Sequence, residues 1–176
     1  MKLSVATNFK PDFLDAISGY PVTELFGKLP SDSIGGGRAS FMLSPLTVAQ
    51  LREHVRSAAE RDIGFNYLIN SACMDNREYT REGQKDLERL LELVEECGAS
   101  AVTVSLPFLL YIIKKRHPGL KVRIGVYAHV DSVAKAKFWE NLGADCITLE
   151  SISVNRDFDA FGMLYSGKLW GVGTNL

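Results

Sequence analysis

Three polar loops of this sequence, each predicted to follow a strand, carry the side chains that could do chemistry. The first contains Gly35, Gly36, Gly37 and Arg38. Successive backbone N–H groups beside a guanidinium form a concave site that suits a phosphate or carboxylate. The run matches neither the dinucleotide-binding fingerprint nor the phosphate-loop pattern. A flexible loop that needs positive φ at its glycines is the alternative explanation.

The second loop spans residues 70–80 and places one cysteine among amide and charged side chains. Cys73 could act as a nucleophile if a base lay nearby, and His129, at the end of another predicted strand, is the candidate base. A cysteine and a histidine that are unrelated in the fold would look the same in the sequence. The residues of this loop predicted to bind substrate are Asn70, Asn76, Arg77 and Glu78.

The third loop follows Glu150 and contains Asn155, Arg156 and Asp157 in succession. Arg156 could bind two oxygens of a carboxylate or phosphate at once. In the alternative interpretation Asn155 caps a helix and Asp157 lies in its first turn, where a negative charge is favourable. Glu150 ends a predicted strand and is a candidate general acid or base, or a substrate contact.

The elements that must position these loops alternate along the chain. Helical patterns end at glycines in short turns, whereas strands run into longer polar loops. Such repeats predict parallel strands whose carboxyl ends carry the polar loops and the ligand site. The predicted strands are 3–7, 22–29, 65–70, 101–106, 122–130, 146–150 and 168–174, and the predicted helices are 11–18, 47–62, 80–98, 108–115, 132–142 and 157–165.

The helix predicted over 47–62 has the clearest apolar face, at spacings of three and four residues. That face places His54 on the solvent side, and His117 falls in a turn at the opposite edge of the sheet. Neither histidine is expected to act in chemistry. The residues of the predicted apolar face are Val48, Leu51, Val55, Ala58 and Ala59.

The composition is that of a soluble globular domain, with 46% hydrophobic and 23% charged residues among 176. A net charge of −1 argues against a broad nucleic-acid-binding or membrane-binding face, although a local basic patch remains compatible with it. We expect no membrane span and no signal peptide. Three scattered cysteines, Cys73, Cys97 and Cys146, suit free thiols in the cytoplasm. Their spacing predicts no metal site.

Periodicity alone leaves two α/β architectures open. Seven strands fit an open, doubly wound sheet, whereas a closed eight-fold β/α barrel needs one more unit and typically about 250 residues.

Four runs in the sequence carry a resemblance that bears on this choice. In chain order they occupy residues 26–32, 35–38, 65–70 and 155–158. Together they resemble the collagenase-like peptidase family (unassigned-type peptidase family 32) along essentially the whole chain, and the last run is the most specific. The resemblance implies a TIM-type β/α barrel that is incomplete here: a single truncated domain over residues 1–176, with about seven parallel strands and six helices.

The resemblance also implies a function. The complete protein is expected to be an oxygen-independent, iron–sulfur-dependent hydroxylase of an RNA base or of an aromatic or quinone ring. The alternatives are a peptidase, as the family name says, or a non-catalytic barrel half that assembles with a C-terminal partner. We expect no cofactor in this chain, because the family's cluster-binding cysteines lie mostly beyond the seventh strand. Open barrel edges predict self-association or a partner chain, and the chain could be a naturally shortened or split product or a recombinant fragment.

Overall fold

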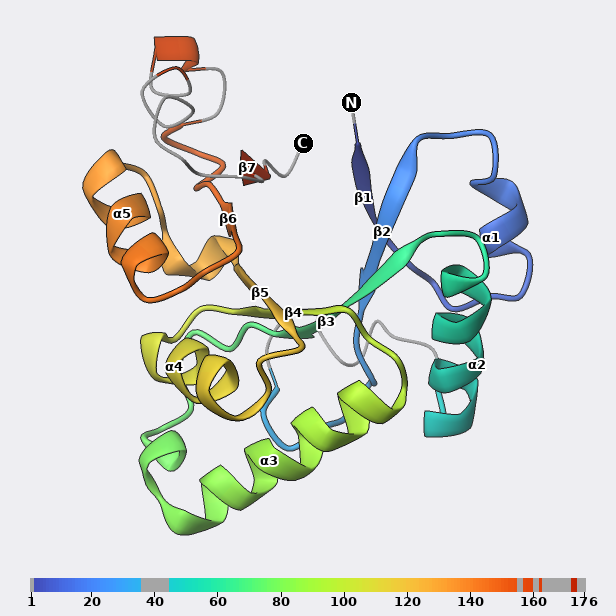
Figure 1. Ribbon diagram of the computed structural model, residues 1–176, viewed down its shortest axis with the longest axis horizontal. Helices are drawn as coiled ribbons and strands as arrows, with labels where there is room; N and C mark the ends of the chain where they lie inside the picture. Colours follow the sequence, from blue (N-terminus) through green and yellow to red (C-terminus); the bar gives the residue numbers. More distant parts are fainter. Residues whose placement is uncertain (1, 36–44, 155–156, 160–161, 163–171, 174–176) are drawn as a thin grey trace.

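The computed structural model describes residues 2–35, 45–154, 157–159, 162 and 172–173 of the chain. Figure 1 shows its elements along the chain. In order they are β1 (Leu3–Ala6), α1 (Phe13–Ala16), β2 (Val22–Gly27), α2 (Val48–Ala59), β3 (Gly64–Ile69), the 3₁₀ helix η2 (Arg77–Tyr79), α3 (Arg81–Glu96), β4 (Ala101–Val104), α4 (Pro107–Arg116), β5 (Lys121–Ile124), the 3₁₀ helix η3 (Val126–Ala128), α5 (Val133–Asn141), β6 (Cys146–Thr148) and β7 (Val172–Gly173).

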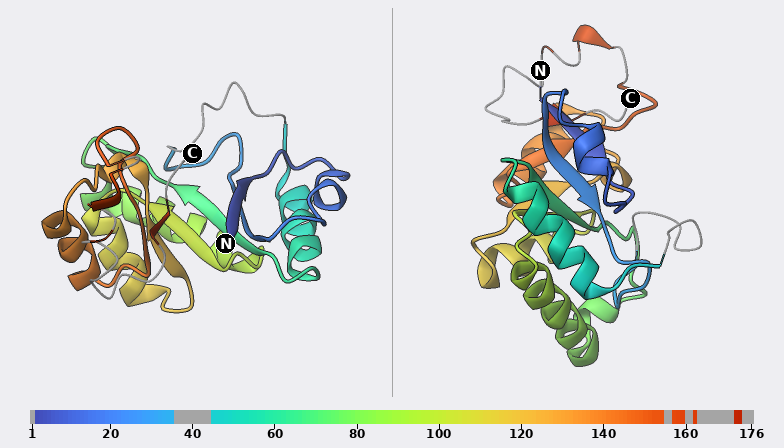
Figure 2. Two further views of the ribbon diagram at one scale, coloured as in Figure 1. Left: turned by 90° about the horizontal axis from the view of Figure 1, so that it is seen from above. Right: turned by 90° about the vertical axis from the view of Figure 1, so that its right-hand side faces the viewer.

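The seven strands form one parallel sheet in which each strand pairs with its neighbours in sequence, from β1 to β7. Helices α2 to α5 lie around the outside of the strands (Figures 1 and 2). A doubly wound sheet would reverse its strand order at a switch point and carry helices on both faces, so this order is that of a barrel. With β1 and β7 at the two ends of the row, the predicted incomplete β/α barrel is confirmed.

Local sequence signals set the helix boundaries. Thr47 accepts a hydrogen bond from the backbone N–H of Gln50 (3.2 Å) and the Gln50 side chain accepts one from the N–H of Thr47 (2.9 Å), so the two residues form a capping box before α2. Thr80 caps α3 as predicted, and Pro107 opens α4. After α3, Gly98 has φ of 84°, a conformation that glycine adopts without steric cost.

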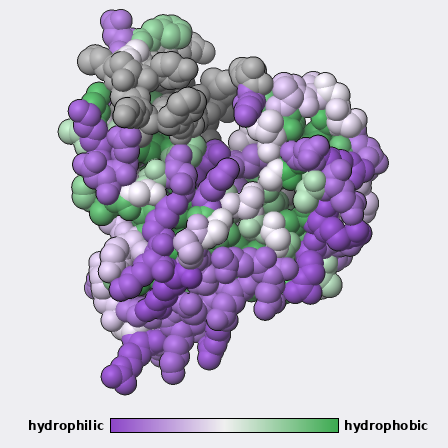
Figure 3. All heavy atoms as spheres, in the orientation of Figure 1, coloured by the Kyte–Doolittle hydropathy of each residue, from purple (hydrophilic) through white to green (hydrophobic). Residues whose placement is uncertain are grey.

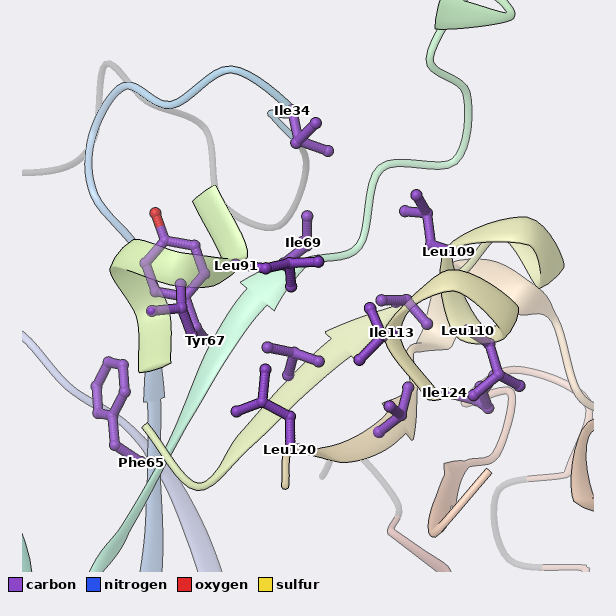
Figure 4. Close-up of a cluster of buried hydrophobic side chains, with 14 of the residues drawn as sticks. Ile34, Phe65, Tyr67, Ile69, Leu91, Leu109, Leu110, Ile113, Leu120 and Ile124 are labelled. Atoms are coloured by element: carbon purple, nitrogen blue, oxygen red, sulfur yellow. The ribbon is translucent and has the colours of Figure 1, made fainter. Parts of the chain in front are cut away.

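Alternation along the strands separates the apolar core from the inner face of the barrel. On β3, Phe65, Tyr67 and Ile69 point outward and are at most 2% exposed. Figure 4 shows them among leucine and isoleucine side chains that include Leu91 of α3 and Ile113 of α4. Truncating a buried phenylalanine to alanine typically costs about 3–5 kcal/mol, so these contacts hold the helices against the sheet.

Helix α3 shows the division between core and solvent most clearly. Its predicted stripe, Leu87, Leu90, Leu91 and Val94, is buried. Its other side is charged, and Figure 3 shows the hydrophilic surface that α3 presents along the lower edge of that view. No helix in the described ranges is both long enough and apolar enough to cross a membrane.

Helix α2 differs from its predicted orientation. Val48 and Ala59 are exposed, whereas His54 is buried at 8% exposure. The reason is a polar contact that periodicity does not record, because the His54 Nε2 atom lies 2.8 Å from the Thr7 hydroxyl just beyond β1. This hydrogen bond makes burial of the imidazole tolerable.

Strand β5 is shorter than predicted, since it ends at Ile124 rather than at residue 130. The apolar pattern continues through the 3₁₀ turn η3, which explains the overestimate. His129 then has left-handed backbone angles (φ 47°), and only Val130 rejoins the sheet, through a bridge to Leu149. Most of the predicted helix over 157–165 and of the predicted strand over 168–174 lies outside the described residues.

Candidate functional site at the carboxyl edge of the sheet

The inner face of the barrel carries a polar network across its first five strands. Glu24 accepts hydrogen bonds from the Ser4 hydroxyl (2.5 Å) and pairs with Arg123 (2.9 Å). Asn66 accepts a hydrogen bond from the Thr103 hydroxyl (2.9 Å) and lies 3.5 Å from Glu24. The Glu24–Arg123 pair joins β2 to β5 over β3 and β4. We call these five residues the inner network.

Towards the carboxyl ends of the strands, a second set of residues shares one layer of the inner face. The register pairs Ile69 with Val104, Val104 with Ile124 and Ile124 with Ile147. The residue that comes directly after each of these four has its side chain on the other face of the sheet, which is the inner face. These four following residues therefore lie next to one another. These residues are Asn70, Ser105, Gly125 and Thr148, and we call them the inner row.

The loop after β2 is organised by the carboxylate of Asp32. It accepts hydrogen bonds from the backbone N–H of Gly35 (2.7 Å) and from the Tyr67 hydroxyl (2.8 Å), and it pairs with Lys28 (2.9 Å). The side chains of both charged residues are 2% exposed. Burial first, and the neighbouring carboxylate second, raise the pKa of Tyr67 far above its ordinary value, so its hydroxyl stays protonated and donates.

This scaffold leads into the predicted anion-binding loop. Gly35 has φ of 75°, which agrees with the alternative explanation of a loop that needs positive φ at its glycines. Gly36, Gly37 and Arg38 lie outside the described residues, as do Asn155 and Arg156 of the third loop. The binding roles predicted for these five residues stay predictions.

The loop after β3 is a compact turn in which Asn76 has left-handed backbone angles (φ 62°). Arg77 pairs with Asp86 of α3 at 2.8 Å, so its guanidinium is engaged within the fold. Glu78 is buried at 6% exposure, and its Oε2 atom has no hydrogen-bond partner. Among the residues predicted in this loop, Asn70 and Glu78 each have a buried side-chain oxygen without a hydrogen-bond partner.

Cys73 is exposed on the same loop, and its Sγ atom accepts a hydrogen bond from the Asp75 backbone N–H at 3.3 Å. Within the described chain Cys73 and His129 share no hydrogen bond. Their roles as nucleophile and base therefore stay predictions.

Glu150 lies at the carboxyl end of β6 and is 8% exposed. Its carboxylate accepts hydrogen bonds from the backbone N–H of Ile152 (2.9 Å) and from the N–H and hydroxyl of Ser153 (both 2.6 Å). These bonds, chiefly from the Ser153 side chain, lower the pKa of Glu150, and nearby His129 lowers it further. Glu150 is thus an ionised carboxylate that orders its own loop, a state that suits a base or a cation contact better than a general acid.

Asp157, the described member of the third loop, is exposed, and its backbone N–H donates to the carbonyl of Val154 at 3.1 Å. The bond therefore joins Asp157 to the end of the turn over residues 151–154.

Sequence reasoning missed most of the inner face. No local motif marks Ser105, Gly125, Thr148 or the Glu24–Arg123 pair as site residues. A partial signal is present as alternation: Asn66 and Asn70 on the β3 segment, and Thr103 and Ser105 on the β4 segment, lie on the face opposite the apolar core.

The three cysteines do not fit the iron–sulfur cluster that the family resemblance implies. Cys73 lies at the carboxyl edge, whereas Cys97 caps the end of α3 and Cys146 begins β6. Burial raises the pKa of both Cys97 and Cys146, which opposes the thiolate form that a cluster needs. Nor does any group of three or more His, Cys, Asp and Glu residues in the described ranges have an arrangement that could hold a metal ion.

Comparison with solved structures supports the fold. The chain is similar to the U32 peptidase Mk0906, with a TM-score of 0.75 and 19% identity over 99% of this chain and 67% of that chain. It is also similar to the citrate synthase SbnG, with a TM-score of 0.55 and 11% identity over 94% of this chain and 72% of that one. At these identities the likeness concerns the barrel alone.

Sequence comparison goes further. The chain is 32% identical, over 126 residues, to an uncharacterised protease of Methanocaldococcus jannaschii. That match covers 72% of this chain but 36% of the relative, so the chain spans about a third of the relative's length. The model of peptidase family U32 matches residues 36–151, which is well over half of the chain and includes β3 to β6 with the carboxyl-edge loops that follow β3, β4 and β5. On this evidence the chain belongs to peptidase family U32.

Proposed function

We propose that this chain is the substrate-binding part of a U32 enzyme, and that the complete enzyme hydroxylates an RNA base or an aromatic or quinone ring without using oxygen. The observation that supports a substrate-binding role is the inner row, where buried polar side chains end adjacent strands of a family U32 barrel. The carboxyl ends of barrel strands are where enzymes with this fold bind their substrates.

The hydroxylase assignment rests on the family resemblance. Because Cys73, Cys97 and Cys146 do not fit a cluster, any cluster in the complete enzyme would be bound by another segment. The described residues contribute binding and orientation: Glu150 supplies a fixed negative charge next to His129, and the row from Asn70 to Thr148 supplies neutral hydrogen-bonding groups.

A peptidase is the alternative, and the protease name of the Methanocaldococcus jannaschii relative favours it. The geometry supports it less well. A cysteine peptidase needs its thiol within reach of a base, yet Cys73 accepts a hydrogen bond from Asp75 and none joins it to His129.

Assembly with a further barrel segment is the third part of the proposal. Strand β1 is at the end of the sheet, and Leu3, Val5 and Ala6 are only half-buried, whereas every residue of the central strand β4 is buried. A half-buried apolar edge with free backbone groups is a site for pairing with another strand. We propose that a C-terminal partner segment, or a second copy of this chain, pairs there.

The test compares the source organism with and without the gene under anaerobic growth. Mass spectrometry of RNA nucleosides and of extracted quinones should show one species, heavier by one oxygen atom, that is lost with the gene and restored by the wild-type gene. In parallel, the purified chain is assayed against labelled peptides. Unchanged nucleosides and quinones, together with peptide cleavage that Cys73→Ala abolishes, would establish the peptidase instead.

A further inference from the structure

We propose that the inner row binds an uncharged amide or lactam group of a small ligand, with Asn70 and Ser105 as the principal hydrogen-bonding residues and Gly125 leaving space for the Asn70 side chain. No sequence motif marks this row, and its members come from four different strands. The register of the sheet is what places them together.

Two unsatisfied side chains carry the proposal. Asn70 and Ser105 are each 7% exposed, and the Oδ1 atom of Asn70 and the Oγ atom of Ser105 have no hydrogen-bond partner. Burying a polar atom without a partner is unfavourable, so native proteins seldom leave two such atoms side by side. In the inner network, Thr103, two residues before Ser105, is bonded to Asn66, four residues before Asn70. The Thr103 hydroxyl is thus paired within the inner face, whereas the Ser105 hydroxyl, the next one on the same face of this chain segment, has no partner.

The chemistry of the row indicates what would satisfy it. The row contains no charged side chain, so an ionic ligand would lose its hydration there without gaining a counter-charge. Asn70 presents an acceptor and two donor hydrogens side by side, and the Ser105 hydroxyl can donate or accept. An ammonium would leave the Asn70 Nδ2 group unpaired, and a carboxylate would leave Oδ1 unpaired. An amide pairs with both.

Gly125 shapes the row. A Cβ atom at this position would lie 2.9 Å from Thr103 Cγ2 and 3.1 Å from both Cβ and Nδ2 of Asn70. Real Cβ atoms are rarely found so close to their neighbours, so glycine allows the Asn70 side chain to extend across β5 on the inner face. The absence of a side chain at position 125 therefore gives the Asn70 amide its place in the inner row.

The inference rests on the proposed function in one respect, because both place ligand binding at the carboxyl edge. Their failures are distinguishable. If the amide probes do not bind, the proposed ligand binding at the inner row is wrong, whereas the result of the gene deletion is unaffected. Unchanged RNA and quinones in the deletion strain, with probe binding intact, would contradict the hydroxylase alone.

The binding test uses the side-chain amide signal of Asn70 in the full chain, observed by ¹⁵N–¹H NMR and assigned by its absence in Asn70→Ala. Acetamide and 2-pyrrolidinone are the open-chain and cyclic amide probes, and sodium acetate, methylammonium chloride and glycerol are the comparison solutes. We expect saturable shifts with both amide probes only. In Ser105→Ala the amide probes should bind about ten-fold more weakly, the equivalent of one lost hydrogen bond.

A stability measurement separates a ligand-binding role from a structural one. Ser105→Ala removes a hydroxyl without a partner, so the Tm of the ligand-free chain should stay the same or rise. The matched control is Thr103→Val on the same strand and face, which removes a hydroxyl that is bonded to Asn66 and should lower the Tm by about 2–4 °C. Absence of saturable shifts with the amide probes, equal shifts with the ionic solutes, or a Tm loss in Ser105→Ala as large as in Thr103→Val would each overturn the proposal.

Discussion

Asp32 illustrates how one buried carboxylate can order a functional loop. Its oxygens are bonded to Lys28, Tyr67 and the backbone of Gly35, so a strand end, a core aromatic residue and the start of the glycine-rich loop meet at a single side chain. An ion pair this deeply buried contributes little net stability relative to an apolar pair, but removing one partner is costly. The pair therefore constrains the position of the loop.

Asp32→Asn tests this role. The substitution keeps the shape but removes the charge opposite the buried ammonium of Lys28, so the free energy of unfolding should fall by about 3–5 kcal/mol in urea denaturation. Tyr67→Phe, the control, removes only the hydroxyl contacts with Asp32 and Leu29 and should cost about 1–2 kcal/mol. Similar losses in the two variants would contradict the importance of the charge.

His54 makes stability depend on pH. Burial lowers its pKa below the ordinary 6.5, so the unfolded chain takes up a proton more readily than the folded chain. The stabilisation from a neutral His54 is complete above about pH 6.5 and decreases as the pH falls towards the folded-state pKa. The urea midpoint should therefore be lower at about pH 5.5 than at about pH 7.5. In His54→Gln this difference should shrink, and an unchanged pH profile would show that His54 is not responsible.

At the scale of elements, the inner network and the helices act on opposite faces of the same sheet. The helices cover the apolar outer face, whereas Glu24 and Arg123 connect β2 directly to β5 across the inner face. Two strands lie between them, so this contact requires the sheet to curve inward. The pair is partly shielded, with side-chain exposures of 17% for Glu24 and 22% for Arg123.

Glu24→Gln should consequently lower the free energy of unfolding by about 2 kcal/mol, because it removes a charge-assisted contact and leaves the Arg123 guanidinium without its carboxylate. Thermal or urea denaturation measures the effect. Glu53→Gln is the matched control: Glu53 forms an ion pair with Arg56 on the exposed surface of α2, where solvent screening makes such a pair nearly neutral. If the two substitutions had equal effects, the inner network would contribute no special stability.

At the scale of the whole molecule, the open edge of the sheet is the most consequential feature. The backbone N–H groups of Leu3 and Thr7 bond to the β2 side, to Pro21 and Phe26. Since alternate residues of a parallel strand bond to the same neighbour, the N–H groups of Ser4 and Ala6 point to the other side of β1. That side is where a further strand would have to pair to close the barrel.

Light scattering after size-exclusion chromatography tests this edge. The wild-type chain should show a mass that rises with concentration, because exposed edges pair. Ala6→Pro removes one outward N–H without removing a bond to β2, and it should shift the distribution towards the monomer. A wild-type chain that stays monomeric at every concentration, without a partner, would contradict self-association through β1.

The sequence by itself determined where the elements lie and which edge of the sheet carries the polar loops. Thr47, Thr80, Pro107 and Gly98 mark helix ends through bonds and backbone angles that span only a few residues, which is why those predictions were accurate. Periodicity failed where one contact outweighed the local pattern, as at His54, or where an apolar run continued through a turn, as after Ile124.

Only the tertiary structure decided which polar residues meet. Asn70, Ser105, Gly125 and Thr148 are far apart in the chain, and their alignment follows from strand register, which depends on the packing of whole strands. The same holds for the Glu24–Arg123 contact, which joins residues 99 positions apart in the chain. Side-chain direction on a strand can be deduced from its own sequence, but adjacency between strands is a property of the assembled sheet.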